Sequence, residues 1–155
     1  MQVDVDTREY IEVLKDLTEQ GQEVSLTVYG TSMEPFLKHK RDRVSLRRPE
    51  NPLRKGDLVF YQRRSGEYIM HRIVNIKEHQ YYLAGDHHTC IEGPVERQQI
   101  FAVVTGVQRK GRWMTENHRV WKFYSRWWRW LLPLRRIGNR LRHGAGNLYR
   151  RILRS

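Results

Sequence analysis

Residues 24–35 read VSLTVYGTSMEP, and this stretch decides the fold. Val24, Leu26 and Val28 alternate with polar neighbours, which is the pattern of a strand with one buried face. Gly30 then ends the strand and begins a turn. We therefore expect a β-rich body in which this first strand leads directly into an exposed turn.

Further apolar runs follow, and each has the length of a short strand. Turn signals that contain proline or glycine separate them, among them Lys55-Gly56-Asp57 and Ser65-Gly66. Several short strands punctuated by turns predict a mainly β domain. The expected strands are residues 43–46, 57–62, 68–75, 80–84 and 100–107.

The segment that precedes the first strand has the period of a helix. Tyr10, Leu14 and Leu17 recur at helical intervals, and Gly21 supplies a stop signal. We expect one amphipathic helix over residues 7–20, with its apolar stripe docked against the β body.

The positive charge of the chain is concentrated at its C-terminal end. The net charge is +12, but residues 1–107 hold 15 Lys and Arg against 16 Asp and Glu, whereas residues 108–155 hold 14 against 1. All five tryptophans also lie after residue 107. We therefore expect a folded domain over residues 1–107 and a basic, Trp-rich helical tail over residues 108–155.

The tail has the pattern of a basic amphipathic helix. Val120, Tyr124, Trp127 and Leu131 recur at intervals of three and four, and Pro133 interrupts the pattern. Basic helices that carry tryptophan suit the headgroup region of an anionic membrane, so a membrane surface is the expected partner. Packing on the domain or on another protein is an alternative, and stacking on nucleic-acid bases is the least favoured one.

No stretch reaches the roughly 18 consecutive apolar residues that a spanning helix needs. The chain opens with MQVDVD and not with a basic, then apolar leader. We expect peripheral association with a membrane or a cytoplasmic location. Cys90 is the single cysteine and no HExxH or CxxC spacing is present, so neither a metal nor another cofactor is expected.

Ser32 lies just after the first strand, in a turn between the flexible Gly30 and the rigid Pro35. A serine hydroxyl is a weak nucleophile until a neighbouring base takes its proton. His71, inside the apolar run 68–74, offers an imidazole whose ordinary pKa of about 6.5 suits that role. A serine in a turn and a histidine in a strand are each more often structural than catalytic, so the pair needs further support.

A histidine base works best when a carboxylate fixes its tautomer through the other ring nitrogen. Asp86 and Glu92 are the two candidates, because both lie in the segment GDHHTCIE of residues 85–92. The residues alone leave the choice between them open.

Four segments resemble the successive sequence boxes of signal peptidase I, a family of serine endopeptidases. The resemblance covers about residues 24–107. It implies the β-rich peptidase fold that this family shares with LexA-type peptidases, and cleavage of a precursor or leader peptide next to small residues. The four segments are Ser32-Met33-Glu34-Pro35, Lys55-Gly56-Asp57-Leu58-Val59, His71-Arg72 and Gly85-Asp86.

Met70-His71-Arg72 resembles the endoplasmic-reticulum, archaeal and sporulation-associated bacterial branch of this family, which has a histidine base where most bacterial enzymes have a lysine. In that branch a second acidic residue follows the Gly-Asp box by six positions and completes a Ser, His, Asp set. Glu92 holds this position here, with glutamate in place of aspartate. Asp86 matches the first acidic residue, which is a structural or supporting partner.

Gly30 lies where many bacterial signal peptidases have a serine that helps to stabilise the oxyanion. The resemblance therefore implies that the backbone N–H of Ser32 acts with another donor, either Thr31 or a nearby amide, with Met33 as part of the same supporting turn. The pattern Gly30-Thr31-Ser32-Met33 also resembles LexA-type and phage repressor peptidases. Those relatives use a lysine base and carry an N-terminal DNA-binding domain.

These features predict a mainly β serine peptidase domain with an N-terminal helix and a basic helical tail. The expected function is a serine endopeptidase of the signal peptidase I type, with a peptide or precursor protein as its substrate. Two alternatives stay open: a catalytically degenerate binding protein that keeps the peptidase fold, and a maturation protease dedicated to one peptide.

Overall fold

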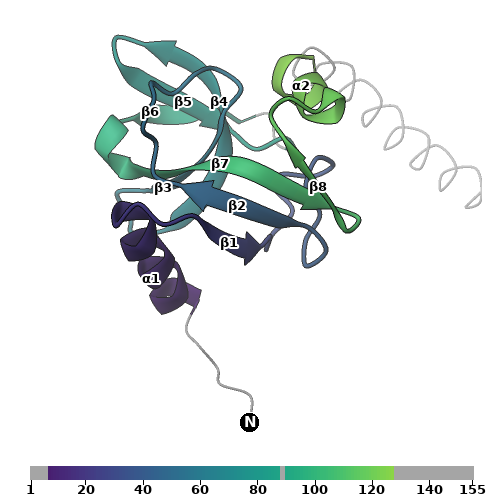
Figure 1. The fold of residues 1–155 in the computed structure, drawn as a ribbon. Coiled ribbons are helices and arrows are strands. Elements are labelled where there is room, and N and C mark those ends of the chain that lie inside the picture. The colour runs from purple at the N-terminus through teal and green to yellow at the C-terminus, as the bar shows by residue number, and fades with distance from the viewer. Residues whose placement is uncertain (1–6, 88–89, 128–155) are drawn as a thin grey trace, which may run out of the picture.

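The computed structural model describes residues 7–87 and 90–127 (Figure 1). Within these residues two helices, α1 (Thr7–Glu19) and α2 (Arg119–Arg126), accompany an antiparallel sheet. A short 3₁₀ turn, η1 (Arg97–Gln99), precedes the seventh strand. The strands are β1 (Val24–Thr27), β2 (Arg43–Arg47), β3 (Leu58–Gln62), β4 (Tyr68–Lys77), β5 (Gln80–Ala84), β6 (Glu92–Val95), β7 (Ile100–Arg109) and β8 (Arg112–Thr115).

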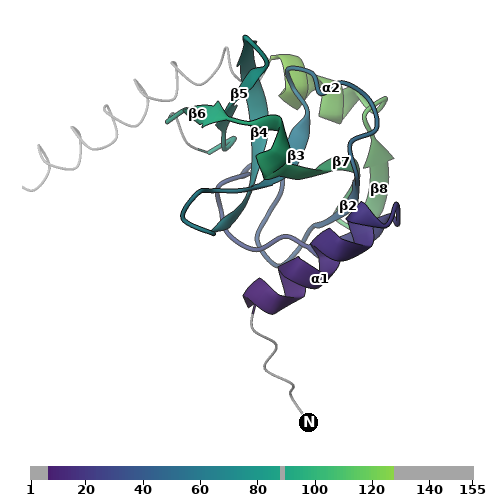
Figure 2. The ribbon, with the colours of Figure 1, turned by 90° about the vertical axis from the view of Figure 1, so that its left-hand side faces the viewer.

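The strands follow one another in the order β1-β2-β7-β3-β4-β5-β6, and β8 pairs with β7. The long strand β7 joins the two halves of the sheet, because it pairs with β2, β3 and β8. Figures 1 and 2 show α1 and α2 on opposite sides of the β-strands, with α1 below them and α2 above them in both views. This architecture confirms the prediction of a mainly β fold with an N-terminal helix.

Strand β3 is buried on both faces and separates two apolar clusters. Side chains alternate between the faces of a strand, so neighbouring residues of β3 enter different clusters. Leu58 and Phe60 lie in the main core, whereas Val59 and Tyr61 lie in the second cluster. Tyr61 is fully buried there.

Helix α1 confirms the predicted helix but turns a different stripe toward the sheet. Ile11, Leu14 and Thr18 are its buried residues, whereas Tyr10 is 43% exposed. Their spacing of three and four residues is that of one helix face. The prediction that placed Tyr10 in this stripe was wrong, because Ile11 occupies the contact with the core instead.

Strand β1 ends earlier than predicted. It stops at Thr27, and from Val28 the backbone pairs with the next loop: Val28 N–H donates to the Asp42 carbonyl at 2.9 Å, and Lys40 N–H donates to the Val28 carbonyl at 2.8 Å. Gly30 then takes a positive φ of 89°, a conformation that favours glycine. The chain therefore bends sharply just before Ser32.

Residues 108–127 lie against the rest of the molecule in the described part of the chain. β7 continues to Arg109, β8 pairs with it, and Trp121 of α2 is buried in the main core. The division of the chain at residue 107 stays a prediction, and Leu131 and Pro133 lie outside the described residues. No helix among the described residues is long and apolar enough to span a membrane.

Candidate active site

A pocket of about 450 Å³ brings together the turn after β1, strand β4 and the start of β6. Leu26, Val28 and Phe60 provide apolar parts of its wall. Six of the seven residues predicted for the site line this pocket, and Asp86 is the exception. The six are Gly30, Thr31, Ser32, Met33, His71 and Glu92.

Ser32 sits on a turn that buried neighbours hold in place. Glu34 N–H donates to the Thr31 carbonyl at 3.1 Å, and Leu37 N–H donates to the Met33 carbonyl at 2.9 Å. Met33 is only 2% exposed, so it anchors the turn in the core while Ser32 remains partly exposed. The serine is therefore accessible on a stiff support.

The loop after β5 contacts the backbone of Ser32 closely. His87 N–H donates to the Ser32 carbonyl oxygen at 2.9 Å. A methyl group placed on Gly85 would lie 2.5 Å from that oxygen and 3.2 Å from Nε2 of His71. Glycine is required at position 85 because the serine backbone and the imidazole approach it together.

His71 presents its two ring nitrogens to different partners. It is buried on β4, with 6% of its surface exposed. Nε2 lies on the side of Gly85, 3.2 Å from the place that a methyl group on Gly85 would take. The Ser32 carbonyl oxygen lies 2.5 Å from the same place. Nδ1 lies 3.4 Å from the Tyr61 hydroxyl oxygen and 3.7 Å from Oε1 of Glu92. A histidine that acts as a general base needs one ring nitrogen for the nucleophile and the other for an acid, and Nε2 is the nitrogen on the side where the Ser32 backbone approaches Gly85.

Glu92 is held by two donors from β3 and the turn that follows it. Oε2 accepts hydrogen bonds from the Tyr61 hydroxyl at 2.6 Å and from Nε of Arg63 at 2.9 Å, and Nη2 of Arg63 donates to Oε1. Burial acts to raise the pKa of Glu92, but these hydrogen bonds and the nearby charges of His71 and Arg63 outweigh it and lower the pKa. Glu92 is therefore an ionised carboxylate at neutral pH.

Asp86 has a different partner. Arg72 donates to it with two parallel hydrogen bonds, from Nε at 2.8 Å and from Nη2 at 2.7 Å, and both side chains are almost fully buried. Nη1 of Arg72 also donates to the carbonyl of Gly56 and to the hydroxyl of Ser125 on α2. The pair fixes the loop whose residues 85 and 87 contact Ser32, so Asp86 supports the site from behind the pocket.

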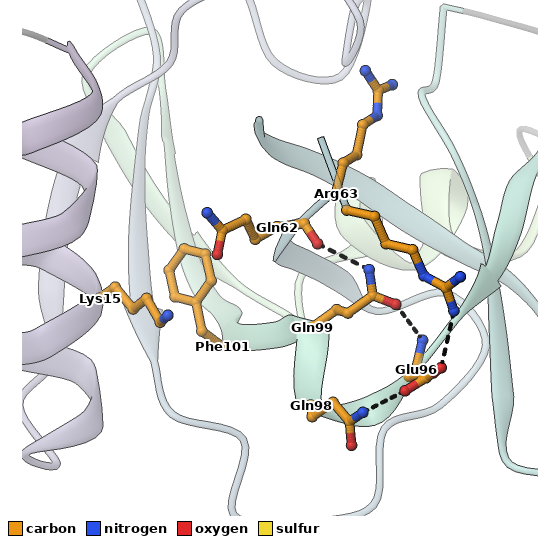
Figure 3. Close-up of a pocket in the computed structure, with 8 residues that line it drawn as sticks. Lys15, Gln62, Arg63, Glu96, Gln98, Gln99 and Phe101 are labelled. Carbon is orange, nitrogen blue, oxygen red and sulfur yellow. Dashed lines mark hydrogen bonds and ion pairs between the residues drawn. The ribbon is translucent and has the colours of Figure 1, made fainter. Parts of the chain in front are cut away.

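A second pocket, of about 400 Å³, lies next to Arg63, which lines both (Figure 3). Its polar groups bond mainly with one another: Nε2 of Gln99 donates to the Gln62 carbonyl at 3.0 Å, and Glu96 N–H donates to Oε1 of Gln99 at 2.9 Å. No serine, cysteine or histidine is among the described residues that line it. This pocket therefore lacks the nucleophile and the base that the first one contains.

Metal-ligand clusters are absent from residues 7–87 and 90–127, in which no group of three or more His, Cys, Asp or Glu side chains could hold an ion. Cys90 is a free, exposed thiol.

Sequence reasoning missed Tyr61 and Arg63. The pairing of β3 with β4 places Val59 opposite His71 and Tyr61 opposite Ile69. Tyr61 is thus a diagonal neighbour of His71 on the same face of the hairpin. The turn signal at Ser65-Gly66 could have given this register, because a hairpin turn fixes which residues of its two strands face each other.

Comparison with known protein families assigns the chain to one of them. The model of the Peptidase S24-like family matches residues 1–106, a range that includes Ser32, His71 and Glu92. No curated protein matches the chain at a significant level. Because the family match covers well over half of the sequence, the chain belongs to the Peptidase S24-like family of serine-type peptidases.

Proposed function

We propose that this protein is a serine endopeptidase of the signal peptidase I type, which cleaves a precursor or leader peptide with Ser32 as nucleophile and His71 as general base. The observation that carries the proposal is the placement of the His71 ring, with Nε2 and the Ser32 carbonyl both close to Gly85 and with Nδ1 beside Glu92. Neutral His71 takes the hydroxyl proton as Ser32 attacks a peptide carbonyl. The acyl-enzyme that forms is then hydrolysed by water, which His71 activates in turn.

The basic residues of the pocket support a histidine base, as in one branch of signal peptidase I, over the lysine base of LexA-type and phage repressor peptidases. Arg63 and His71 are the basic residues among the described residues that line the pocket, and no lysine is among them. An arginine side chain keeps its proton at all relevant pH values, so it cannot act as the base. His71 is the group in this pocket that can accept a proton from serine near neutral pH.

The turn around Ser32 supplies the proposed oxyanion site. We place the backbone N–H of Ser32 there, with Thr31 as the second donor, because Gly30 has no hydroxyl to contribute. Met33 keeps the turn in position through its burial. The apolar wall formed by Leu26 and the neighbouring strands supports a substrate with small apolar residues next to the cut site.

The part of α2 that faces away from the core supports a membrane surface as partner. Trp121 packs inward, whereas Phe123 and Trp127 are 41% and 63% exposed, and Lys122 and Arg126 are exposed beside them. Aromatic rings with adjacent cations bind at the headgroup boundary of anionic bilayers. We propose that this face and the basic residues that follow hold the enzyme at a membrane, where precursors are also found.

Co-expression with a secretory precursor tests both parts of this proposal. Wild-type enzyme is expected to shorten the precursor after a small residue, with a matching change in mass, and Ser32→Ala is expected to leave it intact. The enzyme should sediment with the membranes and be released by high salt, because salt screens attraction to anionic lipids. Folded wild-type enzyme that cleaves no precursor would contradict the signal peptidase type. Enzyme that stays in the supernatant while cleaving would contradict only the membrane role.

Cleavage is expected to fall at acid pH because protonated His71 cannot accept the proton of Ser32. Glu92 does not produce this loss: its pKa is lowered in the folded protein, so it stays ionised, and its contribution to stability is lost only as the pH falls through that lowered value. The loss of rate at acid pH should therefore follow the protonation of one group, the imidazole of His71. Initial rates measured between about pH 5 and pH 8 check this, and a rate that stays constant down to pH 5 would exclude a histidine base.

A further inference from the structure

We propose that the hydroxyl of Tyr61 links His71 to Glu92, so that the imidazole is oriented by a tyrosine and glutamate pair and not by a carboxylate alone. This inference rests on the proposed role of His71 as general base. Tyr61 is a positioning residue in this arrangement, because it acts on the ring of His71 and does not touch the substrate.

The distances favour a path through the hydroxyl. Oε1 of Glu92 is 3.7 Å from Nδ1 of His71, which is too far for a hydrogen bond. The Tyr61 oxygen is closer to Nδ1, at 3.4 Å, and it donates to Oε2 of Glu92 at 2.6 Å, the length of a bond to a charged acceptor. The longer contact is expected to shorten when the ring becomes charged, as catalytic hydrogen bonds do in the reacting complex.

The single proton of the hydroxyl sets the direction of the link. Tyr61 is fully buried, and its burial, with the hydrogen bond to Glu92, raises the pKa of the phenol, which keeps its proton. That proton is donated to Glu92. Toward His71 the phenol oxygen can therefore only accept, so Nδ1 must carry a hydrogen. Nε2 then carries no hydrogen, which is the tautomer that a base for Ser32 requires.

Arg63 completes the arrangement by holding Glu92 in place. It donates from Nε and Nη2, one bond to each carboxylate oxygen, while its Nη1 donates to Glu67 at 2.9 Å. The carboxylate is thereby held on the Tyr61 side of the ring. The link also gives a role to glutamate at position 92, because the hydroxyl bridges the gap that the carboxylate leaves to Nδ1.

The test compares Tyr61→Phe with the wild-type enzyme by ¹⁵N NMR of the histidine ring, with the His71 signals assigned from their loss in His71→Gln. In wild-type protein at neutral pH, Nδ1 is expected to be protonated and Nε2 bare. In Tyr61→Phe the two nitrogens are expected to shift toward a mixture of tautomers. Because the phenylalanine ring keeps the shape of the buried side chain, the fold is expected to persist, which circular dichroism checks. Tyr81→Phe is the matched control, since Tyr81 packs against the same apolar cluster, and it should leave the His71 signals unchanged.

Kinetics provide the second readout. Tyr61→Phe is expected to lower kcat by about 10²-fold with KM unchanged, because misorientation of the base affects the transition state and not substrate binding. An Nε2-protonated ring in the wild-type enzyme would overturn the link even if Tyr61→Phe failed to fold. Unchanged tautomer and unchanged kcat in folded Tyr61→Phe would overturn it as well, while Ser32-dependent cleavage in the same preparation would leave the proposed function standing.

Discussion

Replacement of Ser32 by alanine is expected to lower cleavage of a peptide substrate by about 10⁶-fold, because it removes the hydroxyl that we propose to form the acyl-enzyme. His71→Gln is expected to have a similar effect, since the hydroxyl then has no base to accept its proton. Residues that act as one unit are not additive, so the double variant should be no slower than either single variant. The measurement is single-turnover cleavage of a peptide with small residues before the scissile bond.

Ser65→Ala is the matched control for this result. Ser65 lies in the exposed turn between β3 and β4, where its hydroxyl donates to the surface residue Glu67 at 3.1 Å. Its loss should leave the cleavage rate within about twofold of wild type, as surface substitutions away from a site are nearly neutral. Cleavage that persists in folded Ser32→Ala would remove Ser32 from its proposed role.

Replacement of Arg72 by leucine is expected to reduce the free energy of unfolding by about 3–5 kcal/mol. The side chains of Arg72 and Asp86 are only 1% and 3% exposed, and their two hydrogen bonds are at 2.8 and 2.7 Å. Leucine would leave the Asp86 carboxylate buried without its counter-ion, which is the costly state of a broken ion pair. Urea unfolding followed by circular dichroism measures the loss.

Two further variants test whether the loss comes from the buried charge of Asp86. Arg72→Leu combined with Asp86→Leu should recover much of the stability, because no charge then remains buried. Arg64→Ala breaks the exposed ion pair with Glu96 and is expected to change the free energy of unfolding by less than about 1 kcal/mol. A loss no larger in Arg72→Leu than in Arg64→Ala would mean that the buried pair does not hold the loop behind Ser32.

Local patterns predicted most of the fold because local forces determine those elements. The helix over residues 7–20 and the strand that begins at Val24 carry clear periods of 3.6 and two, and both are present in the structure. Strand β6 was missed because Gly93 and Pro94 make its sequence poor for a strand. Strand β8 was missed because its residues RWMT carry the charge and tryptophan that mark the tail.

The arrangement of the site depends on pairing between distant segments, which the sequence shows less clearly. The residues alone left Asp86 and Glu92 open as partners of His71, whereas the resemblance favoured Glu92; in the structure Arg72 binds Asp86, and Arg63 binds Glu92 beside the imidazole. Both arginines come from the β3–β4 hairpin, and the pairing of β4 with β5 and of β5 with β6 brings the two carboxylates to it. The assignment of roles to these residues remains a proposal that the experiments above test.

The most direct measurement is peptide mapping by mass spectrometry after treatment of the folded protein with a serine-reactive acylating probe. The proposed mechanism predicts one adduct, on Ser32, that is absent from Ser32→Ala and forms far more slowly in His71→Gln. Folded wild-type protein that gains no adduct, or that carries it on another serine, would contradict Ser32 as the nucleophile.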